Sequence, residues 1–477
     1  MIKRLCLIAA FSLLFNSIYA QVVPDSYRQQ KEAEMLHFKD SISNEYVKYL
    51  ERLWTEYRLF LGEPSPRSVE PQEQPQIDTA DTNALKTDRG IEYSLMETRM
   101  VESQPLAVNG QQSVITRNYT VQFYGRELNL AIPKGAASLK LDGISERQVA
   151  HYWKRLLENH AEQSIISLDN KRRDLYLNDW GMFDMTRHLA AAVYPNRPDE
   201  QAVFTIFLLD ALHYDVRVGR MDDRLVMLLN TGSRLYDIPY VEIGTTRYYA
   251  FGNLHPQMNN LRSYDRPMPQ TYKSVDMHLT YSPRLGGALS SKKYGNTVSG
   301  HKVELRVNQP LMDFYASYPQ TELHIYATAA MEEAFAAAIE RELKPFVESK
   351  SPVEALNSLL GFMQRGFTYQ PDRKQFGHEK NYFCEENFYY PANDCEDRAV
   401  LFAKVVKQLL GYDVVLLEYD DHVATAVNLP VRVSAEQLYL DIEGRRYTVC
   451  DPTCLNAKVG QVSPRQRGKK ARVILTK

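Results

Sequence analysis

Residues 393–402 read NDCEDRAVLF, and this pattern predicts the start of a helix with a cysteine in its first turn. The helix is expected to run to Leu410 and to stop at Gly411, because glycine readily adopts the left-handed conformation that ends helices. A thiol in the first turn faces unpaired backbone N–H groups and the positive end of the helix dipole, which favour the thiolate. Cys395 is therefore a candidate nucleophile.

Three predicted strands follow the cysteine helix, at residues 414–418, 423–427 and 446–450. His422 opens the second strand, where an imidazole can face the helix start and act as a general base. Asp451 ends the third strand, directly before a Pro-Thr pair. A carboxylate there can accept the proton of the other ring nitrogen and hold the imidazole in one tautomer.

This order of cysteine, helix, strand, histidine, two strands and Asp-Pro-Thr resembles the transglutaminase-like superfamily, a branch of the papain-like cysteine enzymes. The resemblance covers residues 351–460 and implies Cys395 as nucleophile, His422 as base and Asp451 as its orienting partner. It also implies an α+β, papain/transglutaminase-like domain in which the cysteine helix packs on an antiparallel sheet. The backbone N–H of Cys395 would be one oxyanion donor, and three upstream residues are candidates for the other, namely Tyr389, Tyr390 and Asn393.

An internal repeat predicts two copies of one unit. Residues 199–230 match residues 397–428 at an offset of 198, with nine of 32 positions identical, including Tyr-Asp-Val and Asp-Asp runs. A one-residue insertion then continues the match. In the first copy Arg197, Arg224 and Gly252 replace the cysteine, the histidine and the aspartate, so this copy is expected to be catalytically dead. Arg197 and Arg224 are candidates for a cationic cleft that binds a carboxylate.

The N-terminus has the pattern of an exported protein. Residues 1–20 combine a basic start, an apolar stretch and a small residue at Ala20, which predicts a signal peptide and a mature chain that begins at Gln21. A membrane anchor is the competing interpretation, but the apolar stretch is too short to span a bilayer. Residues 21–62 are expected to form an amphipathic helix and residues 63–90 a flexible linker. The predicted location is the periplasm or the exterior.

The rest of the chain is predicted to comprise four regions. These are a β-rich segment (91–144), the degenerate transglutaminase-like domain (145–260), a β-rich segment with a helix (261–344) and the catalytic domain (345–477). Alternating patterns at residues 303–307 and 322–326 predict strands within the third region.

Four cysteines follow the predicted signal peptide, and they cluster near the C-terminus: Cys384, Cys395, Cys450 and Cys454. Their spacings lack the short paired gaps of structural zinc sites, so neither a metal nor a cofactor is predicted. Cys450 and Cys454 are expected to pack in the core or to form a local disulfide bridge that involves Cys384.

The expected chemistry is acyl transfer by a thiolate. With water as acceptor the chain would be a cysteine peptidase or amidase, and with a lysine amine it would be a cross-linking transglutaminase; hydrolysis is favoured because water needs no binding site. The expected substrates are proteins, peptides or peptidoglycan stem peptides. A formal net charge of −2 argues against nucleic acid as the main partner, and no integral membrane segment is expected after signal cleavage. The rival class is a non-enzymatic, polypeptide-binding scaffold of the cell envelope.

Overall fold

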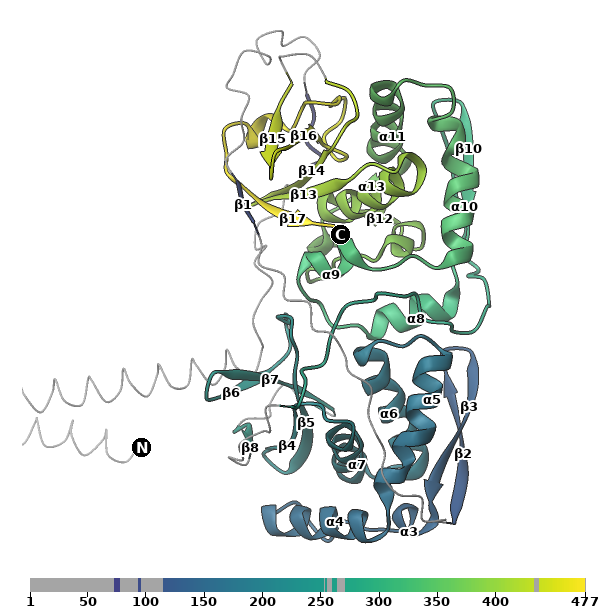
Figure 1. Cartoon of the computed structure of the whole chain (residues 1–477), viewed down its shortest axis with the longest axis vertical. Helices are drawn as coiled ribbons and strands as arrows, with labels where there is room; N and C mark the ends of the chain where they lie inside the picture. Colours follow the sequence, from purple (N-terminus) through teal and green to yellow (C-terminus); the bar gives the residue numbers. More distant parts are fainter. Residues whose placement is uncertain are drawn as a thin grey trace, which may run out of the picture. The chain divides into compact units, whose positions relative to one another are not determined.

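The computed structural model describes residues 73–77, 93–95, 115–252, 254, 260–263, 271–432 and 437–476. The predicted signal peptide and the predicted amphipathic helix lie outside these residues. The described part of the chain is an α+β fold in which most strand pairs are antiparallel (Figure 1). Within it, no helix is both long enough and apolar enough to span a bilayer.

The elements of the first half begin with a short strand and a hairpin, continue through helices and end in a sheet. In chain order they are β1 (Tyr93–Leu95), β2 (Thr116–Phe123), β3 (Arg126–Pro133), α3 (Lys134–Ala137), α4 (Glu146–Glu158), η2 (Ala161–Gln163), α5 (Ser164–Asp174), α6 (Asp179–Val193), α7 (Pro198–Ala211), β4 (Val216–Met221), β5 (Arg224–Asn230), β6 (Tyr240–Ile243), β7 (Thr246–Phe251) and β8 (Arg262–Ser263).

The second half has a hairpin and several helices before its own sheet. Its elements are β9 (Tyr294–Val298), β10 (His301–Leu305), α8 (Gln309–Ser317), α9 (Leu323–Thr328), α10 (Glu333–Leu343), η3 (Lys344–Phe346), α11 (Pro352–Gly366), β11 (Thr368–Tyr369), α12 (Asp372–Gln375), η4 (Cys384–Phe388), β12 (Ala392–Asn393), α13 (Cys395–Leu410), β13 (Val414–Tyr419), β14 (His422–Val427), β15 (Tyr439–Ile442), β16 (Arg445–Cys450), η5 (Pro464–Gln466) and β17 (Ala471–Leu475).

The two sheets have the same connectivity. The first has the strand order β6-β7-β5-β4-β8, and the second has β15-β16-β14-β13-β17 with β1 added in parallel beside β17. In each segment one helix, α7 or α13, precedes the first hairpin and contacts it. The duplication inferred from the sequence therefore corresponds to one arrangement of a helix and antiparallel strands that occurs twice.

The strand registers repeat as well. Met221 pairs with Arg224 at the end of the first hairpin, and Tyr419 pairs with His422 at the end of the second. Both pairs are related by the sequence offset of 198 residues. The next hairpin, β6–β7 against β15–β16, repeats at an offset of 199, as the predicted one-residue insertion requires. The side-chain period of a strand is two, so equal registers place equivalent residues on equivalent faces.

One strand prediction is wrong. Residues 322–326 were expected to form a strand, but Leu323–Thr328 is helix α9, whose first five residues are all buried. A short helix that is buried on all sides has no polar face, so its sequence lacks the periodic pattern that marks a helix. Such an apolar run fits a strand as well as a helix. The prediction for residues 303–307 agrees better, because β10 spans His301–Leu305.

Part of the predicted linker contacts the second segment. Gln76 forms a parallel bridge with Leu455, and the side-chain amide of Gln74 donates to the carbonyl of Thr453 at 2.7 Å. Ile77 is 9% exposed and packs against Cys454 and Ala457. Residues 73–77 thus lie against the loop that follows β16.

Candidate active site

Cys395 is the first residue of α13, the helix that covers β13 and β14. The preceding residue, Asp394, has an extended backbone and is the N-cap, so the chain turns into the helix directly at the cysteine. The Cys395 thiol is 2% exposed and donates a hydrogen bond to Oε2 of Glu396 at 3.0 Å. This carboxylate is a neighbour that the sequence analysis did not consider.

His422 and Asp451 form a hydrogen-bonded pair at the same end of the domain. Gly411 ends α13 with a left-handed backbone (φ 72°), so β13 runs back along the helix and its turn into β14 lies at the helix N-terminal end. His422 begins β14 there, and its Nε2 lies 2.9 Å from Oδ2 of Asp451. The other ring nitrogen, Nδ1, is buried and has no hydrogen-bond partner among the described residues.

Asp451 is held by a set of backbone donors. Its Oδ1 accepts from the N–H groups of Thr453 and Cys454, and its Oδ2 accepts from the N–H of Ser463 at 2.9 Å. Burial alone would raise the pKa of Asp451, but the charge and hydrogen bond of His422 and these N–H groups lower it below its ordinary value. The carboxylate is therefore ionised at neutral pH and can orient the imidazole.

The site is closed in this conformation. Exposed fractions are 2% for Cys395, 1% for His422 and 0% for Asp451. A substrate therefore reaches the thiol only after neighbouring groups move.

All four described cysteines are free thiols, and all are buried. The local bridge that the sequence analysis allowed for Cys384, Cys450 and Cys454 is not formed, so packing is the role the structure gives them. Burial raises the pKa of all three of these thiols. They are consequently held in the neutral, unreactive form.

The three oxyanion candidates lie just upstream of the helix, and the best placed of them already has partners. Asn393 ends β12; its Nδ2 donates to Oδ1 of Asn387 at 2.7 Å, and its Oδ1 accepts from Nε of Arg398. The hydroxyl of Tyr389 accepts from Gln309, and the ring of Tyr390 packs edge-on against Tyr389. The second oxyanion donor stays a prediction.

The first segment differs at the equivalent positions. Arg197 is the N-cap of α7, and its guanidinium donates to Glu200 and to the carbonyl of Leu139. Arg224 begins β5 and is half-buried. Gly252 follows β7 and has φ 130°. Since Glu200 already supplies a carboxylate to Arg197, the predicted cationic cleft gains no support from this arginine.

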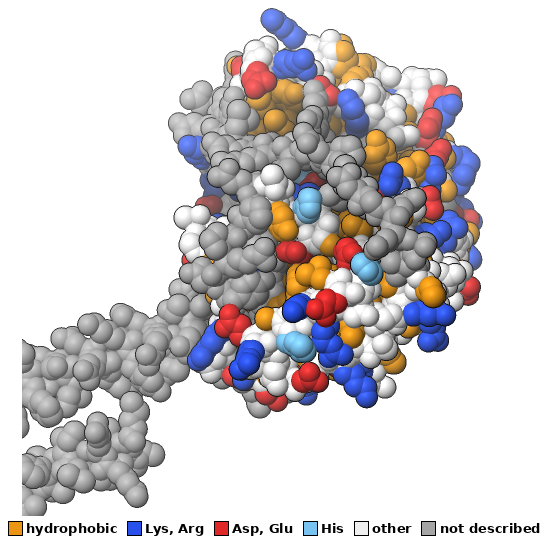
Figure 2. All heavy atoms as spheres, turned by 60° about the horizontal axis from the view of Figure 1, so that its bottom comes forward, with side chains coloured by type: hydrophobic (Ala, Val, Ile, Leu, Met, Phe, Trp, Pro, Cys, Tyr) orange, Lys and Arg blue, Asp and Glu red, His pale blue; other side chains and the backbone are white. Residues whose placement is uncertain are grey.

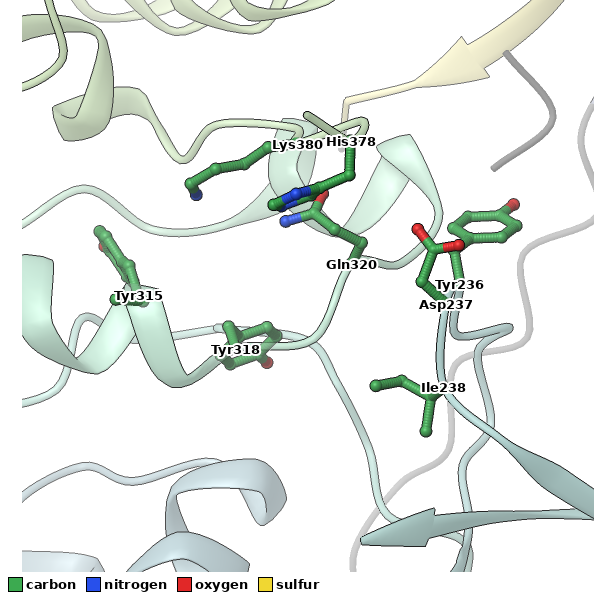
Figure 3. A pocket seen from close by; sticks show the side chains of 9 residues that line it. Tyr236, Asp237, Ile238, Tyr315, Tyr318, Gln320, His378 and Lys380 are labelled. Carbon is green, nitrogen blue, oxygen red and sulfur yellow. The ribbon is translucent and has the colours of Figure 1, made fainter. Parts of the chain in front are cut away.

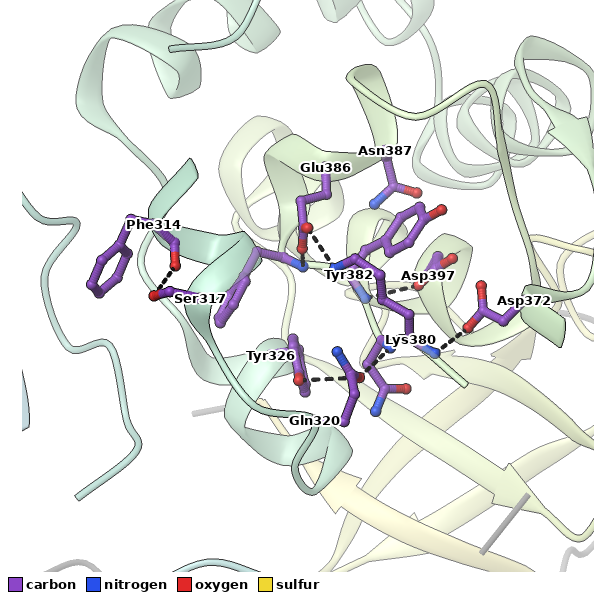
Figure 4. A network of polar contacts seen from close by, with 12 residues as sticks. Phe314, Ser317, Gln320, Tyr326, Asp372, Lys380, Tyr382, Glu386, Asn387 and Asp397 are labelled. Atoms are coloured by element: carbon purple, nitrogen blue, oxygen red, sulfur yellow. Dashed lines mark hydrogen bonds and ion pairs between the residues drawn. The ribbon is translucent and has the colours of Figure 1, made fainter. Parts of the chain in front are cut away.

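A cluster of buried acids around the cysteine was missed. Five carboxylates lie together there, each 5% exposed or less: Asp372, Glu379, Asp394, Glu396 and Asp397. The run Asp-Cys-Glu-Asp was the available signal, but acids in the first turn of a helix usually face solvent, where they favour the helix dipole. Residues 372–382 contact this helix end, where Tyr382 donates its N–H to Asp397 (Figure 4).

A cavity of about 440 Å³ lies on the other side of the same loop (Figure 3). His378 and Lys380 line it from the loop, Tyr315 and Tyr318 from α8 and the residue after it, and Asp237 from the first segment. Burial raises the pKa of Asp237, although His378 and Arg373 oppose the shift. The lining of the cavity is more apolar than polar, and it contains none of the three predicted catalytic residues.

The surface has no dominant charge on the face drawn in Figure 2, where basic and acidic side chains are intermingled. This agrees with the formal net charge of −2. Comparisons with protein-family models, with curated proteins and with solved structures found no match. The function proposed below is therefore inferred from the residues and geometry of the site alone.

Proposed function

We propose that the chain is an exported cysteine-dependent acyl-transfer enzyme of the transglutaminase-like type, with Cys395 as nucleophile, His422 as base and Asp451 as its orienting partner. The observation that carries the proposal is the buried hydrogen bond of 2.9 Å between Nε2 of His422 and Asp451. In the described part of the chain, Nδ1 of the same imidazole has no hydrogen-bond partner. The strand that begins with His422 packs against the helix that begins with Cys395. A nucleophile, a base and an orienting carboxylate on such elements support acyl transfer by a thiolate as the proposed chemistry.

In the proposed reaction the thiolate of Cys395 attacks the carbonyl carbon of an amide. A C–S bond forms, and the C–N bond breaks as the His422 imidazolium gives its proton to the leaving amine. In the second half, His422 removes a proton from water and the hydroxide oxygen attacks the thioester carbon. A C–O bond forms, the C–S bond breaks, the carboxylic acid leaves, and the thiolate of Cys395 is restored beside the protonated imidazole. Asp451 stays ionised and stabilises the imidazolium.

Hydrolysis is the form of the reaction that we favour over transfer to a lysine amine. Water needs no dedicated site, whereas an amine acceptor must be positioned with binding energy. The substrate class is a polypeptide or a peptidoglycan stem peptide, as the resemblance implies.

Selective alkylation tests the proposal without a known substrate. Iodoacetamide at neutral pH, followed by peptide mass spectrometry of the native chain, should label Cys395 faster than the other thiols. Cys384, Cys450 and Cys454 serve as internal controls, because burial keeps all three protonated. Equal or slower labelling of Cys395 would contradict the assignment.

Substitutions of His422 and Asp451 test whether these residues activate the Cys395 thiol or whether the reagent merely has access to it. His422→Ala should slow the alkylation of Cys395 strongly, and Asp451→Asn should slow it less, since it disturbs orientation and leaves the base in place. Thr425→Val is a matched control: its hydroxyl is buried on the same strand and donates to the carbonyl of Cys450. This control should leave the alkylation rate unchanged.

The closed site favours a second candidate, the polypeptide-binding scaffold. The three residues are at most 2% exposed, and the thiol is hydrogen-bonded to Glu396. A scaffold predicts that Cys395 stays unlabelled in the native chain and that His422→Ala changes nothing in its reactivity. The alkylation experiment therefore decides between the two classes.

A further inference from the structure

The carboxylate cluster around α13 contains a buried side chain whose carboxylate has no hydrogen-bond partner among the described residues. Asp394 is 0% exposed, and neither of its carboxylate oxygens has a hydrogen-bond partner. A buried carboxylate without a donor or a counter-ion is costly, because it has lost water without gaining a replacement. The oxygens of Asp394 are thus available as ligands for a cation.

The positions of the neighbouring oxygens suit a single ion. Ligand oxygens of Asp372, Asp394 and Asp397 all lie within 4.8 Å of one another. Two oxygens on opposite sides of one Ca²⁺, at 2.3–2.6 Å each, are at most about 5 Å apart. The three carboxylates can therefore share one ion of this size with little rearrangement.

The basic groups nearby have other partners. The ammonium of Lys380 lies 2.7 Å from Oε1 of Glu386, which is outside the cluster. Arg398 donates through Nε to Asn393 and through Nη2 to the carbonyl of Phe367. Arg373 pairs with Glu379 at the edge of the cluster. Arg398 also acts on Asp394 and Asp397 through its charge. The five acids nevertheless outnumber these three cationic groups.

Two backbone donors hold the surrounding loop in the shape that a metal site needs. The N–H of Lys380 donates to Oδ2 of Asp372 at 2.7 Å, and the N–H of Tyr382 donates to Oδ1 of Asp397 at 2.9 Å (Figure 4). Each carboxylate oxygen has two lone pairs, so these bonds leave acceptor capacity for an ion. The ligands are thus fixed in position before an ion arrives.

We propose that Asp372, Asp394 and Asp397 bind one Ca²⁺-sized divalent cation, which joins the loop of residues 372–382 to the N-terminal end of α13. Hard cations prefer oxygen ligands, and Ca²⁺ tolerates an irregular cage of carboxylates. Mg²⁺ demands octahedral geometry and usually keeps several waters, for which a fully buried cluster has less room. The proposal does not depend on the acyl-transfer reaction, because Cys395 is not one of the ligands.

Terbium luminescence and calorimetry on the full-length chain test the site. After treatment with EDTA and desalting, Tb³⁺ should give tyrosine-sensitised emission that Ca²⁺ reverses, and Ca²⁺ should bind with a stoichiometry of one. Mg²⁺ should bind at least tenfold more weakly. Absence of both signals up to millimolar Ca²⁺ overturns the proposal, and the acids then share protons in place of a metal.

Matched variants locate the ion. Asp394→Asn should weaken Ca²⁺ binding by tenfold or more, whereas Glu385→Gln, which changes a buried carboxylate outside the cluster, should leave it unchanged. Cys395→Ala should also keep full binding, so failure of the proposed enzyme function would not affect this result. Unchanged binding in Asp394→Asn contradicts the site. If that variant does not fold, Asp372→Asn replaces it and the same outcomes apply.

Discussion

At the scale of single residues, the environment of a carboxylate decides its role in this protein. Asp451 has backbone donors and an imidazole, and its pKa is lowered. Glu385 is also fully buried, but burial is the largest influence on it and raises its pKa to about 7. Its Oε1 accepts from the backbone N–H of Glu332, and its Oε2 lies near the hydroxyl of Tyr315. Near neutral pH, Asp451 is thus ionised, whereas a large fraction of Glu385 is protonated.

Glu385→Gln is expected to stabilise the protein in a pH-dependent way. Below pH 4.5, the ordinary value, the acid is protonated in the folded and the unfolded chain and has no effect on stability. Between pH 4.5 and 7 only the unfolded chain ionises, so the stability of the native protein falls as pH rises, by roughly 3 kcal/mol in total. Glutamine does not ionise and keeps an acceptor for the N–H of Glu332.

The measurement for this residue is urea unfolding at pH 5 and at pH 8. The advantage of Glu385→Gln over the native chain should be larger at pH 8. Exposed Glu443→Gln, which lies in the turn between β15 and β16, is the control and should show no such difference. An advantage that is equal at both pH values, or larger at pH 5, would show that the carboxylate is ionised in the folded protein.

At the scale of elements, the stability of α13 depends on the residue that ends the helix as much as on the residues that begin it. Gly411 has φ 72°, and a side chain placed there would meet no atom within 4 Å. The cost of Gly411→Ala is therefore a backbone cost alone, about 1 kcal/mol. Gly361 lies inside α11, and a side chain placed there would come near only the guanidinium of Arg365, at 3.6 Å.

The two glycines should respond in opposite directions to the same substitution. Gly411→Ala should lower the free energy of unfolding by about 1 kcal/mol, whereas Gly361→Ala should raise it by up to about 1 kcal/mol through helix propensity. Denaturant unfolding of both variants measures this. Loss of stability in both would mean that steric contact, and not backbone conformation, governs these positions.

The α+β class and the repeat were readable from the sequence at this scale because their signals are local and periodic. The run of residues 393–402, the Tyr-Asp-Val strand entries and Gly411 predict the helix and hairpin that the structure shows. Helix α9 was missed for the opposite reason. Its burial comes from distant residues, such as the ring of Phe383 that packs against Tyr326, and no local pattern records such contacts.

At the scale of the whole described chain, residues distant in sequence complete the surroundings of the site. Gln74 reaches the carbonyls of Gln364 and Thr453, and Thr453 in turn donates its N–H to Asp451. Ile77 covers Cys454, which is fully buried. The segment of residues 73–77 thus supports the loop that carries the orienting carboxylate.

Ile77→Ala is expected to loosen this contact. Removal of the buried side chain should lower the free energy of local opening by about 2 kcal/mol, because the apolar cover of Cys454 is reduced. Labelling of Cys454 by a maleimide at pH 8, read by mass spectrometry, should accelerate about thirtyfold, because about 1.4 kcal/mol is a factor of ten in an equilibrium constant. Cys384, which lies in η4 and does not contact this segment, should keep its rate. Equal acceleration of both thiols would indicate global destabilisation instead.

The sequence by itself determined the cysteine helix and the strands that follow it, the repeat and the three residues proposed for catalysis, because each is marked by a short local pattern. Tertiary structure decided which of their groups meet: the imidazole and carboxylate 2.9 Å apart, the burial of the Asp-Cys-Glu-Asp run and the docking of residues 73–77. Burial is a property of what folds over a residue. The run Asp-Cys-Glu-Asp is compatible with a solvated helix end and with a closed acidic cluster. In the folded protein, the contacts of residues 372–382 with this helix end produce the closed cluster.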